Sequence, residues 1–140
     1  MEVSAQAASK ERGLQLLKSG QLDEAIDLLS KLVEADPDDP RVHTYLGAAY
    51  SRKGDRLHAV HEFEEALRLE ESAASYYNLG AMYESLHRID EAVREYLTAT
   101  QIDPNHARAA QAVARLHSQY EAAHRPPPEE PVQPADEAAQ

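Results

Sequence analysis

Apolar residues along this chain recur at intervals of three and four, in short stretches interrupted by glycine, proline or clusters of polar residues. Such spacing places the apolar side chains on one face of an α-helix. It predicts helices over residues 6–18, 22–34, 41–52, 56–69, 73–86 and 89–101, and a seventh over residues 106–123. There is no strand signal in the sequence, so the pattern indicates an all-α fold.

The pattern repeats after every second predicted helix. Gly13, Gly47 and Gly80 are spaced by 34 and then 33 residues, and Gly20 and Gly54 are spaced by 34. The same offsets relate Ala25, Ala59 and Ala92; Leu29, Phe63 and Tyr96; Leu16, Tyr50 and Tyr83; and Leu32, Ala66 and Ala99. Small residues at fixed positions allow two helices to approach closely, and a ring fills the gap between them. The period therefore predicts stacked helix pairs.

Several helix ends are marked in the sequence. Gly54 follows a predicted helix, where a left-handed backbone conformation is easily adopted by glycine. Asp39 and Pro40 provide an N-cap followed by a proline at the first helical position. Ser72 and Asn105 are expected to cap the next two first helices in the same way.

Two long motifs carry a resemblance to a known family. They are His43-x2-Leu46-Gly47-x2-Tyr50 followed by Ala59-x3-Phe63-x2-Ala66, and Tyr76-x2-Leu79-Gly80-x2-Tyr83 followed by Ala92-x3-Tyr96-x2-Ala99. Both closely resemble the tetratricopeptide repeat, and a more degenerate copy precedes them. The resemblance implies a right-handed superhelical solenoid of three helix-turn-helix repeats, over about residues 6–39, 40–72 and 73–106.

The residues after the third repeat are predicted to form a capping helix and a tail. Val113, Leu116 and Tyr120 form a narrow apolar stripe on the seventh helix, about 106–123, as a terminal capping helix requires. The repeat domain is therefore expected to span residues 1–124. Residues 125–140 contain five prolines and four acids, and this composition predicts a disordered tail.

Charge and composition narrow the classes of partner. The 140-residue chain carries 14 Lys and Arg against 25 Asp and Glu, for a net charge of −11. That balance argues against nucleic acid and anionic membranes as partners, because both would be repelled. There is no cysteine, and no stretch approaches the ~18 apolar residues of a membrane-spanning helix. A cytoplasmic location is expected.

Candidate chemistry is sparse. Each glycine belongs to one of the repeat series, so none is left for a phosphate-binding loop. His58 and His61 form an i, i+3 pair next to Glu62 and Glu65, which is the best arrangement for a metal. It lacks a clear third ligand, so a solvated helix face is the favoured interpretation and a metal-binding protein the lesser one. We expect no catalytic residues, no metal and no cofactor, and therefore no enzyme.

The first helix of each pair is expected to line the inside of the curved array. Six of the 14 basic residues lie on these inner stripes, with Glu84 as the acid among them. A basic concave wall on an acidic molecule favours an acidic ligand. The predicted peptide-binding groove consists of Lys10, Leu14, Arg41, Tyr45, Arg52, Tyr77, Asn78, Arg108, Gln111 and Arg115.

The resemblance also implies a test for one type of ligand. Chaperone-binding members of the family hold terminal carboxylates with a clamp of Lys and Asn residues and an Arg. Lys10 matches this clamp, but the other positions are Leu14, Tyr45, Ala74 and Asn78. The sequence thus predicts a non-enzymatic adaptor or scaffold that binds an extended, acidic segment of a protein partner, without the chaperone clamp. The alternative is a structural subunit that forms homo-oligomers through exposed Leu14 and Leu17 of the first repeat.

Overall fold

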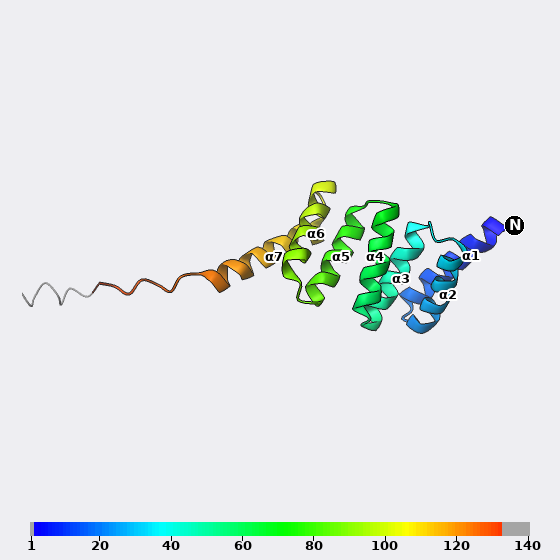
Figure 1. The fold of residues 1–140 in the computed structure, drawn as a ribbon, viewed down its shortest axis with the longest axis horizontal. Coiled ribbons are helices and arrows are strands. Elements are labelled where there is room, and N and C mark those ends of the chain that lie inside the picture. Colours follow the sequence, from blue (N-terminus) through cyan, green and yellow to red (C-terminus); the bar gives the residue numbers. More distant parts are fainter. Residues whose placement is uncertain (1, 133–140) are drawn as a thin grey trace, which may run out of the picture.

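The computed structural model describes the backbone of residues 2–132 and side chains from residue 5 onward. Within that range the chain forms seven helices and no strand, and the helices lie in chain order along one axis (Figure 1). Their bounds are α1 Glu2–Lys18, α2 Leu22–Ala35, α3 Pro40–Lys53, α4 Arg56–Leu69, α5 Ala73–Ser85, α6 Ile89–Ile102 and α7 Ala107–His124. The all-α prediction is confirmed, and only α1 begins more than one residue from its expected start.

The helix ends follow local chemistry. The Asp39 side chain accepts a hydrogen bond from the backbone N–H of Arg41, with Pro40 opening α3, and Ser72 caps α5 through the N–H of Ser75. Gly54 ends α3 with φ of 89°, in the left-handed region. The predicted N-cap of α7 is wrong. His106 rather than Asn105 is the N-cap, and its Nδ1 accepts from the Ala109 N–H, because Asn105 belongs to the preceding turn.

The repeated glycines mark close crossings within helix pairs. A Cβ placed on Gly47 would lie 2.8 Å from the ring of Phe63, and one on Gly80 would lie 2.8 Å from the ring of Tyr96. Each first helix therefore sits directly against a large side chain of its second helix. Overpacking of this kind typically costs ~1–3 kcal/mol, which explains why glycine recurs at this position of the repeat.

The core is divided along the array. One buried cluster joins α1, α2 and α3, with Leu16, Leu29 and Leu46 among its members. A second cluster joins α4, α5, α6 and α7, from Phe63 to Leu116. Tyr50 is partly buried and packs against both clusters, so it connects them.

His43 lies at the junction of α3, α4 and the turn before α3. Its ring is buried, with Nδ1 2.7 Å from a carboxylate oxygen of Glu62 and Nε2 2.7 Å from the carbonyl oxygen of Pro37. Burial by itself would lower the pKa of His43, but the hydrogen bonds to Glu62 and Pro37 outweigh it, and the pKa is raised. His43 is thus a packed, hydrogen-bonded core residue.

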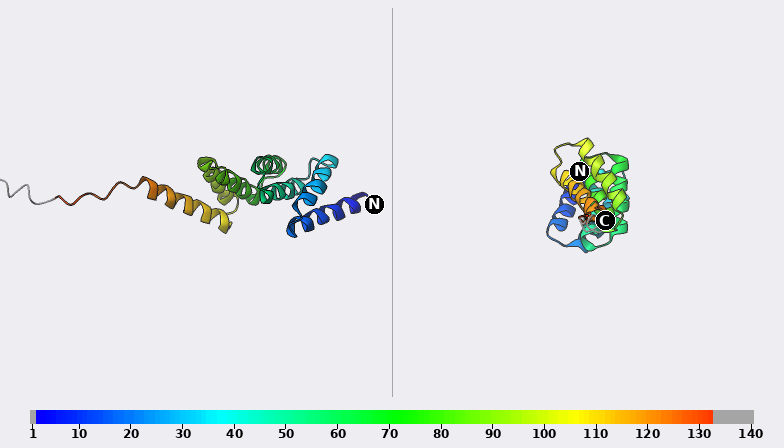
Figure 2. Two further views of the ribbon diagram at one scale, coloured as in Figure 1. Left: turned by 90° about the horizontal axis from the view of Figure 1, so that it is seen from below. Right: turned by 90° about the vertical axis from the view of Figure 1, so that its left-hand side faces the viewer.

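The array is elongated, and in the left view of Figure 2 the blue α1 and the yellow-to-orange α7 both lie toward the lower side of the molecule. None of the helices in the described part of the chain is both long and apolar enough to cross a membrane. Residues 125–132 form no helix and are exposed. The remainder of the predicted tail, residues 133–140, lies outside the described residues.

Candidate functional site

Two hollows lie along the first helices. The one near the N-terminus has a volume of about 220 Å³ and is lined by Ala7, Lys10, Glu11, Leu14, Arg41 and Tyr45. The one near the C-terminus has a volume of about 690 Å³ and is lined by Tyr77, Tyr96, Arg108, Gln111, Ala112 and Arg115. Eight of the ten residues expected in the groove line one hollow or the other, so the inner stripes form two separate depressions.

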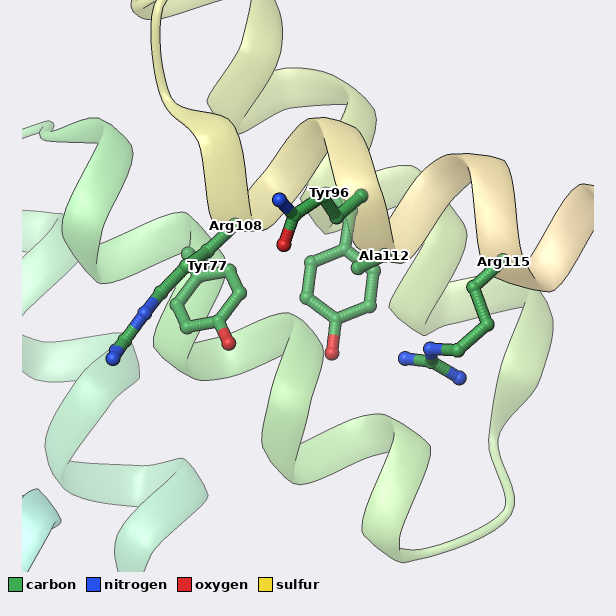
Figure 3. Close-up of a pocket in the computed structure, with 6 residues that line it drawn as sticks. Tyr77, Tyr96, Arg108, Ala112 and Arg115 are labelled. Atoms are coloured by element: carbon green, nitrogen blue, oxygen red, sulfur yellow. The ribbon is translucent and has the colours of Figure 1, made fainter.

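The C-terminal hollow is formed by side chains from α5, α6 and α7. The ring of Tyr77 lies between Tyr96 and His106, with ring centroids 5.6 and 5.3 Å away. In Figure 3 the hydroxyls of Tyr77 and Tyr96 point the same way, Arg108 extends past Tyr77, and Arg115 lies beyond Tyr96. The hollow therefore combines aromatic surface with hydroxyl and guanidinium donors.

Glu84 on α5 neutralises one of these arginines. Arg115 donates from both terminal nitrogens to the Glu84 carboxylate, at 2.6 and 2.9 Å, and Tyr96 donates its hydroxyl to the same carboxylate at 2.8 Å. The contact with Arg115 holds the pKa of Glu84 below its usual range. Burial, together with the bond to Glu84, raises the pKa of Tyr96. Arg115 therefore anchors α7 to α5.

The N-terminal hollow contains a similar pair. Lys10 on α1 forms an ion pair with Asp39, the residue that caps α3. Burial would raise the pKa of Asp39, but the hydrogen bonds to Lys10 and to the Arg41 N–H outweigh it and lower that pKa. Leu14 and Tyr45 are half-buried and line the wall, whereas Arg41 is exposed.

Two predicted residues lie outside both hollows. The Arg52 guanidinium donates to the carbonyl oxygen of Leu17, at the C-terminal end of α1, and so joins α3 to α1. Asn78 is half-buried on α5, and its side chain makes no hydrogen bond to another residue in the described part of the chain. Arg52 is thus committed to a contact within the protein, while the role predicted for Asn78 stays a prediction.

These contacts change the electrostatics of the inner wall. Lys10, Arg52 and Arg115 each have an intramolecular acceptor, in Asp39, the Leu17 carbonyl and Glu84. Arg41 and Arg108 form no ion pair with any residue that the structure describes. One uncommitted arginine therefore remains in each hollow.

Only part of these pairings can be predicted from the sequence. Glu84 is the acid expected on the inner stripes, but its partner Arg115 lies 31 residues further along the chain. The place of Tyr96 in the repeat predicts a core residue, and Tyr96 is buried, yet it also lines the C-terminal hollow.

The two leucines expected to form a self-association surface on the first repeat are both at least half-buried. Leu17 has 8% of its surface accessible and belongs to the N-terminal core cluster, and Leu14 packs against the same cluster. The expectation that Leu17 is exposed is therefore wrong, because α1 packs against both α2 and α3 and Leu17 belongs to their shared core cluster. Leu14 is half-buried and lines the N-terminal hollow.

The histidine pair on α4 does not complete a metal site. His58 stacks on Tyr50, with ring centroids 5.0 Å apart, and its Nδ1 lies 2.7 Å from Asp55. No group of three or more candidate metal-binding side chains occurs among residues 5–132.

Models of known protein families match the same helix pairs. A family described as "TPR repeat" matches residues 13–54, and one described as "Tetratricopeptide repeat" matches residues 73–106. The chain belongs to the tetratricopeptide repeat family. These two matches contain the three repeated glycines at which the helix pairs cross closely.

Individual relatives share this architecture. RNA polymerase II-associated protein 3 of Homo sapiens is 31% identical over 108 residues, which cover 76% of this chain and 16% of that protein. The first TPR domain of Spaghetti, bound to the HSP90 peptide SRMEEVD, is 30% identical, with a TM-score of 0.78 over 84% of this chain and 93% of that one. MamA is 25% identical, with a TM-score of 0.79 over 82% of this chain and 68% of that one. The chain thus spans about a sixth of the length of its curated human relative.

Proposed function

We propose that this chain is a non-enzymatic adaptor that binds an extended, acidic segment of a protein partner along its first helices. The observation that carries the proposal is the presence of one uncommitted arginine in each of two hollows, Arg41 and Arg108. The related Spaghetti domain provides support, because it was solved with the peptide SRMEEVD, which contains two glutamates and one aspartate.

The chemistry of the two hollows suits such a ligand. A guanidinium can donate two parallel hydrogen bonds to one carboxylate, so Arg41 and Arg108 fix acidic side chains at two points. Tyr45 in one hollow and Tyr77 in the other supply flat, amphipathic surface for the segment between those points. Asn78 can donate to and accept from peptide backbone. Ordering an extended peptide is costly, so we expect a dissociation constant on the order of micromolar.

Recognition here differs from the chaperone clamp to which Lys10 alone corresponds. Leu14, Tyr45, Ala74 and Asn78 occupy the other clamp positions, and Lys10 already pairs with Asp39. The two anchoring arginines instead lie in separate parts of the array, on α3 and α7. We therefore expect internal acidic side chains of the ligand, rather than its terminal carboxylate alone, to determine affinity.

The test is a fluorescence anisotropy titration with an array of acidic seven-residue peptides that includes SRMEEVD. Each peptide is compared with a version in which the acids are replaced by their amides. The double variant Arg41→Ala/Arg108→Ala should bind at least about tenfold more weakly, since each charge-assisted hydrogen bond contributes roughly 1.5–3 kcal/mol. Added salt should weaken wild-type binding, because exposed charges are screened over about 10 Å at 0.1 M.

The matched control is the double variant Arg56→Ala/Arg94→Ala. Both of these arginines lie on second helices, are exposed, and form no ion pair among the described residues, so the control changes the net charge by the same amount. Equal loss of binding in the two double variants would show that net charge, rather than the hollows, attracts the peptide. Equal affinity for acidic and amidated peptides would reject the acidic ligand.

A further inference from the structure

A third hollow lies on the other side of α7 from Arg108 and Arg115. It has a volume of about 410 Å³ and an apolar wall that includes Ile89, Val93 and Leu97 of α6 and Val113 and Tyr120 of α7, with His117 beside them. Leu97 is 43% exposed and Tyr120 is 63% exposed. In Figure 1 the end of α7 runs out from the body of the array. This surface is separate from the proposed peptide-binding hollows.

In the second and third repeats, a second helix covers the face of the first helix that is equivalent to the open face of α7. On α3, Gly47 lies under the ring of Phe63, and on α5, Gly80 lies under the ring of Tyr96. The next member of this series, 34 residues on, is Ala114 of α7. Ala114 is exposed, and the described chain provides no eighth helix to cover it.

The chain's own continuation is unsuited to form that helix. Pro126, Pro127 and Pro128 follow directly after α7, and consecutive prolines remove backbone donors and clash with the preceding turn. A helix from another molecule can supply the missing cover. By analogy with α4 and α6, it should run antiparallel to α7 and carry a ring followed three residues later by alanine.

The end of α7 itself carries this pattern. Tyr120-x2-Ala123 matches Phe63-x2-Ala66 and Tyr96-x2-Ala99, the ring-and-alanine pairs of the second helices. Tyr120 and Ala114 lie three residues on either side of His117. If two α7 helices cross antiparallel at His117, Tyr120 of each lies over Ala114 of the other. A single contact between the two α7 helices then covers the exposed Ala114 face of both copies.

We propose that two copies of this chain associate through α6 and α7 about a twofold axis that passes beside His117. The distribution of exposed apolar residues favours a second copy in this arrangement over a head-to-tail stack. Of the six large apolar side chains that are exposed in the described part of the chain, four lie on α6 and α7 and none on α1 or α2. The N-terminal end of a neighbour therefore offers little to the third hollow, whereas an isologous contact pairs the apolar surface with itself.

Charge sets the conditions for this association. Each copy carries a net charge of −11, so two copies repel one another at long range. Salt screens that repulsion and leaves apolar burial intact. The dimer should therefore become stronger with added salt, whereas the proposed binding of acidic peptides should become weaker.

The experiment measures molar mass by size-exclusion chromatography with light scattering, for the full chain over concentrations from about 1 to about 500 micromolar at low and high salt. The mass should rise from 15.5 kDa toward twice that value, and at lower concentration in high salt. Tyr120→Ala should weaken association by about tenfold or more. The control Leu57→Ala removes an exposed leucine, 73% accessible, on α4, and should associate as the wild type does.

The position of the axis has its own test. A residue on a twofold axis meets its own copy, so H117D and H117K should each remain monomeric through like-charge contact, while their equimolar mixture should associate. A wild-type mass of 15.5 kDa under all conditions, or unchanged association of Tyr120→Ala, would overturn the proposal. Association of H117D alone at wild-type strength would do the same. Peptide binding by Tyr120→Ala should be unchanged, so the two proposals fail independently.

Discussion

At the scale of single residues, the two hydrogen-bond partners of His43 determine which protonation state of its ring the folded protein favours. Both ring nitrogens face acceptors at 2.7 Å, a carboxylate oxygen of Glu62 and the carbonyl oxygen of Pro37. A neutral imidazole has one N–H, whereas the imidazolium has two. The buried site therefore favours the charged ring, which is why the hydrogen bonds outweigh burial and the pKa lies above its ordinary value of 6.5.

This raised pKa predicts how stability depends on pH. The folded protein holds the proton more tightly than the unfolded chain, so the contribution of His43 is fully present below about pH 6.5 and is lost as pH rises through the folded pKa. Chemical denaturation from about pH 6 to about pH 9 should show a falling free energy of unfolding that is absent in His43→Phe. Glu62→Gln removes the carboxylate and should reduce the slope. An identical slope in wild type and His43→Phe would contradict this account.

At the scale of elements, two arginines on the same helix have different roles. Arg52, near the end of α3, donates to the last turn of α1, where the carbonyl groups of a helix carry partial negative charge. Arg41, near the start of α3, is exposed and forms no ion pair with any described residue. Their positions in the repeat alone would assign both to the inner wall.

The two arginines therefore predict opposite results. Arg52→Ala should lower the free energy of unfolding by about 1 kcal/mol, because the carbonyl of Leu17 loses a charged donor, and should leave peptide binding unchanged. Arg41→Ala should weaken peptide binding and change stability by less than about 0.5 kcal/mol, as is usual for exposed positions. Thermal or chemical denaturation and peptide anisotropy on both variants check this. Loss of binding in Arg52→Ala without loss of stability would return that residue to the groove.

Helix positions could be predicted from the sequence because their causes are local. Apolar spacing, the Asp39 and Ser72 caps and the left-handed Gly54 are all contained within a few residues. The cap of α7 was missed because Asn105 and His106 are both capable acceptors, and the turn after Asp103 decides between them. Which cations of the inner wall stay free could not be predicted, because their acceptors come from other helices.

At the scale of the whole molecule, the buried core is divided into clusters along the array. The cluster of α1 to α3 and the cluster of α4 to α7 are connected by the close crossing of α3 and α4 at Gly47 and Phe63, by the half-buried Tyr50 and by the His43–Glu62 contact. In a solenoid each repeat is stabilised mainly by its neighbours. A change at one end should therefore loosen the nearer cluster first.

Removal of α7 tests this directly. Ala109, Ala112 and Leu116 of α7 are buried, and losing a buried leucine side chain alone typically costs about 2–5 kcal/mol. A chain that ends after His106 should show faster amide hydrogen exchange in α5 and α6, while α1 to α3 keep most of their protection. A chain that ends after His124 is the control and should exchange as the full chain does, because residues 125–132 are exposed and form no helix. Equal loss of protection in α1 and α6 would mean that the two clusters unfold as one unit, and that the contact between α3 and α4 is stronger than the packing of α7.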